Sequence, residues 1–182
     1  MTVSLELLGR GPSRPDLLED LVVDDASLTE ILGRWTDSVP VVVEAGAATG
    51  LPSPDRVAEV LGRGAPAVVD IGPDPADPAD PAGSAAPLAD LLVIAAHAGV
   101  GFGSGLIPRC ADASGVWAVL SGAVAAMTGA DVAAAIVSPD PAAIVGLSRS
   151  AREAIRDVIT CVVVPRDRAE AVAAELAAAD PG

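Results

Sequence analysis

The chain has 182 residues, the length of one ordinary domain, and 51% of them are hydrophobic, which excludes intrinsic disorder. The formal net charge is −14. This charge argues against a nucleic-acid surface and against an anionic membrane surface, because both are bound by clustered Lys and Arg. We therefore expect a single domain over residues 1–182 that binds neither nucleic acid nor membrane.

Several residue types are missing from the sequence, which contains no Lys, Asn, Gln or Tyr. Without Lys the chain can form neither a Schiff base nor a Walker phosphate loop. The two cysteines, Cys110 and Cys161, are too few for a disulfide scaffold or a four-ligand zinc site. Because no N-terminal stretch has a signal-peptide pattern, we expect a cytoplasmic protein with reduced thiols.

In the first half of the chain, short β-branched runs alternate with helical patterns. We expect strands at 3–8, 41–44 and 67–71, and helices at 16–23, 27–35 and 54–61. Ser27 with Glu30 forms a capping-box pattern, and Ser53 followed by Pro54 is a typical helix start. The repeated Asp-Pro-Ala then predicts a flexible Asp/Pro/Ala-rich loop at 73–84.

The second half continues this alternation. The run at 88–96 fits a strand or a short helix, and we favour a strand at 91–95 because the run is short and lies between Pro87 and Gly99. Further strands are expected at 132–137 and 161–164. Helices are expected at 114–127, from Asp140 through Val158, and from Asp167 to about residue 179.

This pattern predicts an α/β fold with a mostly parallel sheet of about six strands covered by helices. We favour an open doubly wound sheet. A shortened barrel-like layer is the alternative, because a complete eight-unit barrel needs about 250 residues.

Three of the expected strands end in ionisable residues, namely Glu44, Asp70 and His97. Ligands of parallel sheets bind outside the carboxyl ends of the strands, so we expect these three side chains to line one cleft. One imidazole and two carboxylates suit an acid–base pair or a divalent metal. The pattern does not specify a metal or a cofactor, and the alternative is that each residue caps a helix or lies in solvent.

A glycine-rich segment directly follows His97, in which Gly99, Gly101, Gly103 and Gly105 alternate with other residues and Ser104 precedes the last. Alternating glycines let backbone amides approach an anion, so this loop is a candidate binding site for an anionic small molecule. Its spacing differs from the dinucleotide fingerprint, and the alternative is a flexible loop with Phe102 packed against the domain or a partner.

Three arginines, Arg149, Arg152 and Arg156, share one face of the helix expected after Asp140. Such a stripe can receive a phosphate or a carboxylate. Because Glu153 follows Arg149 by four residues, a solvated salt-bridged face is the favoured interpretation.

Two short segments, Gly-Phe-Gly at 101–103 and Gly-Leu-Ser-Arg at 146–149, resemble two loops of dihydropteroate synthases, the pterin-binding barrel family. The resemblance covers these residues only, and it implies a degenerate pterin-binding-like protein. Ser104 and Ser150 stand where that family has lysines, the stretch between the loops is longer, and a chain without Asn lacks the family's pterin-binding residue.

Two functions therefore remain open. The first is a small-molecule-binding or enzymatic domain with its site between Glu44, Asp70, His97 and the glycine loop. The second is a non-catalytic subunit or scaffold domain, whose exposed Ala, Val and Leu faces pack on a protein partner or on another copy in a homo-oligomer. A shared pocket for the three side chains would favour the first.

Overall fold

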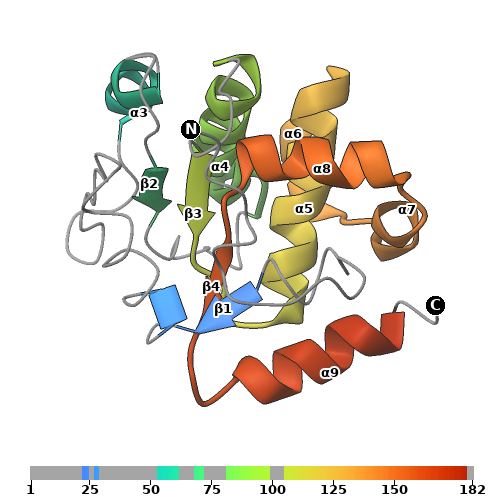
Figure 1. Cartoon of the computed structure of the whole chain (residues 1–182). Helices are drawn as coiled ribbons and strands as arrows, with labels where there is room; N and C mark the ends of the chain where they lie inside the picture. Colours follow the sequence, from blue (N-terminus) through green and yellow to red (C-terminus); the bar gives the residue numbers. More distant parts are fainter. Residues whose placement is uncertain are drawn as a thin grey trace.

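The protein is described by a computed structural model, which covers residues 22–24, 27–28, 53–61, 68–71, 81–98 and 105–179. Most of these residues are helical (Figure 1). In chain order the elements are β1 (Val22–Asp24), α3 (Pro54–Leu61), β2 (Val68–Ile71), α4 (Pro81–His97), β3 (Gly105–Pro108), α5 (Ala113–Thr128), α6 (Val132–Val137), α7 (Pro141–Val145), α8 (Arg149–Val158), β4 (Val162–Val164) and α9 (Ala169–Ala179).

The expected sheet of about six strands is wrong, both as an open doubly wound sheet and as a barrel-like layer. The described strands have three or four residues each and form two parallel pairs, β1 with β4 and β2 with β3. Parallel bridges from Leu106 to Ile159 and from Arg109 to Val163 bring β3 beside β4. Helices cover far more of the described chain than these strands do.

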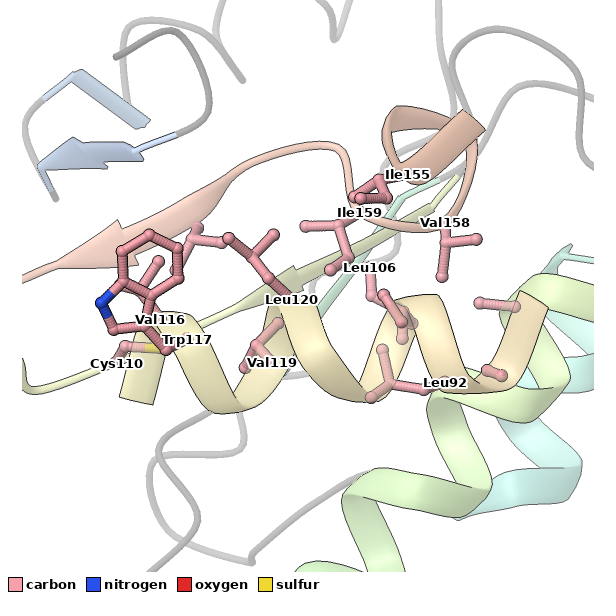
Figure 2. Close-up of a cluster of buried hydrophobic side chains, with 14 of the residues drawn as sticks. Leu92, Leu106, Cys110, Val116, Trp117, Val119, Leu120, Ile155, Val158 and Ile159 are labelled. Carbon is pink, nitrogen blue, oxygen red and sulfur yellow. The ribbon is translucent and has the colours of Figure 1, made fainter. Parts of the chain in front are cut away.

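Buried side chains lie on both faces of the strands. Successive residues of a strand point to opposite sides, and here Val162 and Val164 join one cluster while Val163 joins the other. The larger cluster, the main core, includes Leu92, Leu106, Leu120, Ile155 and Ile159 from α4, β3, α5, α8 and the residue after α8 (Figure 2). The smaller cluster, the second core, consists of Leu28, Ile107, Cys161 and Val163.

The strand expected at 91–95 is wrong, because this segment belongs to the helix α4. Leu91, Leu92 and Ala95 are buried, whereas Val93 and His97 are exposed, and this is the spacing of one buried helix face. Pro87 lies inside α4 rather than at its boundary. The helix also includes residues 81–84, so the described part of the expected loop at 73–84 is helical and the rest lies outside the described residues.

The helix expected at 114–127 is confirmed as α5. Asp112 caps it, because its Oδ1 accepts a hydrogen bond from the Gly115 N–H at 2.9 Å. Gly129 ends it with a φ of 72°, the left-handed conformation that glycine adopts without strain. The strand expected at 132–137 is wrong, because this segment is the short helix α6, which Asp131 caps through the Ala134 N–H at 3.0 Å.

The single helix expected from Asp140 through Val158 is divided into α7 and α8. Asp140 caps α7 through the Ala143 N–H at 3.0 Å, and Ser148 caps α8 through the Ala151 N–H at 3.3 Å. Of the expected apolar stripe, Ile144, Ile155 and Val158 are buried. The pattern identified the buried face correctly but not the break within it.

Other expected elements have mixed outcomes. The helix 54–61 is confirmed as α3, and the Arg56 N–H donates to Ser53 Oγ at 3.3 Å. The strands 67–71 and 161–164 are confirmed, with slightly shorter bounds, as β2 and β4. Residues 22–23 were expected at the end of a helix but belong to β1, and α9 begins two residues after Asp167. Ser27 and Leu28 are helical, while 3–8, 29–35 and 41–44 lie outside the described residues.

Candidate functional site

His97 is the last residue of α4, so it does not lie at the end of a strand. Its side chain is exposed, and its ring Nδ1 is 2.8 Å from the carbonyl oxygen of Val93, one turn earlier in the helix. A carbonyl oxygen can only accept, so in the neutral ring Nδ1 carries the proton and Nε2 keeps its lone pair. Nε2 is therefore the ring nitrogen that can accept a proton or bind a metal.

The two expected partners of His97 are less fully described. Asp70 lies in β2, and its backbone pairs in register with Ile107 of β3, but its side chain is outside the description. Glu44 lies outside the described residues, as do Gly99, Gly101, Gly103 and Ser104. The convergence of Glu44, Asp70 and His97 on one cleft therefore stays a prediction.

The connection from His97 to the next strand differs from the one that the sequence pattern implied. The chain leaves the carboxyl end of α4 and enters β3 at Gly105, which pairs with Val68, the first residue of β2. The glycine-rich segment thus leads into the amino end of a strand. Ligand sites of parallel sheets lie at the carboxyl ends of the strands, which is the opposite edge. This rule therefore gives no support for a ligand site at His97.

Gly105 has a packing role that the pattern of the glycine-rich segment did not reveal. It is buried, and a Cβ atom at this position would lie 2.8 Å from Thr160 Oγ1 and 3.0 Å from the carbonyl oxygen of Val158. Only glycine permits β3 to approach the end of α8 this closely. The Thr160 N–H also donates to the carbonyl oxygen of Leu106 at 2.9 Å, which fixes the two segments side by side.

Both cysteines are buried, and neither is part of a disulfide. Cys110 belongs to the main core and Cys161 to the second core, so they lie on opposite sides of the strands. Burial, assisted by the negative charge of Asp112, raises the pKa of the Cys110 thiol from 9.0 to about 12. A nucleophilic cysteine needs a lowered pKa, so Cys110 lacks the environment of a catalytic thiol.

The arginines of α8 make contacts within the protein. Arg149 Nε is 3.1 Å from Glu153 Oε1, and both side chains are well exposed, which matches the expected salt-bridged face. Arg152 donates from Nε to the carbonyl oxygen of Leu147 at 3.1 Å, and from its terminal nitrogen to that of Val145. Arg152 therefore closes the carboxyl end of α7, a role that sequence reasoning missed because the break between the two helices was not predicted.

Within the ranges that the structure describes, no three His, Cys, Asp or Glu side chains gather into a group that could hold a metal ion. No described helix is both long enough and apolar enough to cross a membrane. Comparisons with known protein families, with curated proteins and with solved structures found no match.

Proposed function

We propose that this chain is a non-catalytic domain that acts by packing on a protein partner. One observation carries the proposal: apart from the exposed His97, the described side chains best suited to nucleophilic or acid–base chemistry include several that help to build the fold. The thiols are buried, Arg152 closes a helix end, and Asp112, Asp131 and Asp140 cap helices. Buried thiols and helix-capping carboxylates stabilise a fold, whereas a nucleophile or an acid–base pair must be accessible to a substrate.

The proposed contact surface is formed by α4, α5 and α6. The exposed large hydrophobic side chains of the described residues are Val93, Met127 and Val137, at 36%, 39% and 42% exposure, and each belongs to one of these helices. The three helices pack on one another, and a Cβ on Gly122 would lie 2.8 Å from both Leu92 and Ile136, the neighbours of Val93 and Val137. The three side chains therefore lie on adjoining helices, and exposed apolar groups on adjoining elements can form a protein-binding surface.

The partner that we propose is a second copy of the chain, since isologous pairing lets one apolar surface cover itself. Two copies of net charge −14 repel each other, so the association should strengthen as salt screens that charge. Sedimentation equilibrium of the full chain should give a mass that rises from 17.9 kDa towards twice that value with concentration, and more readily at about 0.5 M than at about 0.02 M salt.

A matched pair of variants tests whether this surface is the contact. Val137→Asp places a charge on α6, and Ala177→Asp places the same charge at an exposed position of α9. Both variants carry the same net charge, so a general effect of added charge on association is the same in both. We expect Val137→Asp to lose the association and Ala177→Asp to keep it. A mass of 17.9 kDa at every concentration and salt level would contradict the proposal.

The second candidate function is a small-molecule-binding or enzymatic site that includes His97, with Glu44, Asp70 and the segment from Gly99 to Gly105. It is supported by the exposed imidazole, whose Nδ1 is engaged by Val93 and whose Nε2 keeps its lone pair. A histidine that donates one ring nitrogen to a backbone carbonyl is the usual arrangement of a metal ligand. The glycine-rich segment that follows His97 in the sequence suits an anion, because alternating glycines let backbone amides approach it.

Calorimetric titration with Zn²⁺ alone and with inorganic phosphate alone tests this second candidate. We expect saturable binding of at least one probe to the wild type and a loss of at least tenfold in affinity in His97→Ala. The melting temperature of the variant should stay close to that of the wild type, because His97 is exposed. Equal binding by both proteins, or by neither, would contradict a site at His97.

A further inference from the structure

We draw no further inference here: the strongest candidate, the N-terminus of α8 where the hydroxyls of Ser148 and Ser150 lie 3.1 Å apart next to Arg149, is a helix N-terminus at which no second observation points to a ligand.

Discussion

At the scale of single residues, Cys110 illustrates how the fold determines side-chain chemistry. Its N–H donates to the carbonyl oxygen of Val163 at 2.8 Å, which holds the residue against β4. Its thiol lies in the main core close to Val116 and Trp117 (Figure 2). In this environment the ionised form loses its hydration, so the thiol behaves as a small apolar group.

The raised pKa of Cys110 predicts a loss of stability in alkali. The thiol ionises near 9.0 when unfolded and near 12 when folded, so its contribution is complete below pH 9 and is lost as the pH rises towards 12. The chain has no Lys or Tyr, so few other side chains titrate in this range. We expect the free energy of unfolding to fall by about 1 kcal/mol per pH unit more in the wild type than in Cys110→Ala.

Denaturant titrations at pH 9, 10 and 11 measure this slope. Val119→Ala is the matched control, since Val119 is also buried in the main core and its truncation leaves a cavity without removing a titrating group. Its unfolding free energy should be lower at every pH but should keep the wild-type slope. Identical slopes for wild type and Cys110→Ala would contradict the assigned burial of the thiol.

Gly122 is a second residue whose role depends on a neighbour. In an exposed helix, replacing Gly by Ala gains up to about 1 kcal/mol. Here the new Cβ would lie 2.8 Å from Ile136 and from Leu92, so we expect Gly122→Ala to lower the free energy of unfolding by about 1–3 kcal/mol.

A double-mutant cycle identifies the cause of that loss. Ile136→Ala removes one of the two obstructing groups, so it should offset part of the cost of Gly122→Ala and give a coupling of at least about 0.5 kcal/mol. The control is Val137→Ala, at the exposed next position, whose change in the free energy of unfolding should add to that of Gly122→Ala without coupling. A neutral or stabilising Gly122→Ala would show that α5 and α6 are farther apart than described.

At the scale of secondary-structure elements, the junction of α7 and α8 depends on one arginine. The last carbonyl groups of a helix have no partner within it. Arg152 supplies donors to the carbonyl oxygens of Val145 and Leu147, while the Asp140 N–H donates to Ser121 Oγ at 3.2 Å and fixes the start of α7 to α5. We expect Arg152→Ala to destabilise the protein by about 1–2 kcal/mol.

Arg149→Ala is the control for this prediction. Arg149 lies on the same helix but pairs with Glu153 in solvent, where an ion pair contributes about 0.5 kcal/mol or less. Thermal or denaturant unfolding of the two variants should therefore separate them. Equal effects would mean that the two hydrogen bonds of Arg152 stabilise the protein no more than an exposed ion pair does. Retention of stability by Arg152→Met would show that packing of the side-chain stem is sufficient.

The starts of two helices were predicted correctly from a capping residue followed by proline. Ser53 with Pro54 marked the start of α3, and Asp140 with Pro141 marked that of α7. Two of the errors fell on apolar runs, one of them directly after Asp131, which caps α6. The run at 91–95 and the run at 132–137 are rich in Val, Ile and Ala, which fit either a buried strand or a buried helix, and only tertiary packing selects between them.

The wrong strand at 91–95 also affected the prediction of the candidate site. His97 was associated with Glu44 and Asp70 because all three were expected at strand ends, and the change of 91–95 from strand to helix removes that reason for His97. The packing role of Gly105 could not be predicted either. It depends on Thr160 and Val158, which are more than fifty residues away in the sequence.

At the scale of the whole molecule, acidic residues combine local and global roles. Between residues 81 and 148 the basic side chains are His97 and Arg109, while Asp90, Asp112, Asp131 and Asp140 are exposed. Three of these aspartates cap helices, where negative charge is favourable. Together with the rest of the chain they produce a net charge of −14, whose mutual repulsion opposes the compact state.

This balance predicts that added salt stabilises the monomer. Raising the ionic strength from about 0.01 M to about 0.15 M shortens the screening length from about 30 Å to about 8 Å, so repulsion between distant carboxylates weakens more than the hydrogen bonds of the caps. We expect a gain of about 1 kcal/mol, which corresponds to a rise of about 2–4 °C in melting temperature for a domain of this size. Scans at low protein concentration exclude a contribution from association.

Sodium chloride and choline chloride at equal ionic strength should give the same rise if screening is the cause. A fall in melting temperature with either salt would mean that attractive ion pairs such as Arg56–Glu59 and Arg149–Glu153 outweigh the net repulsion.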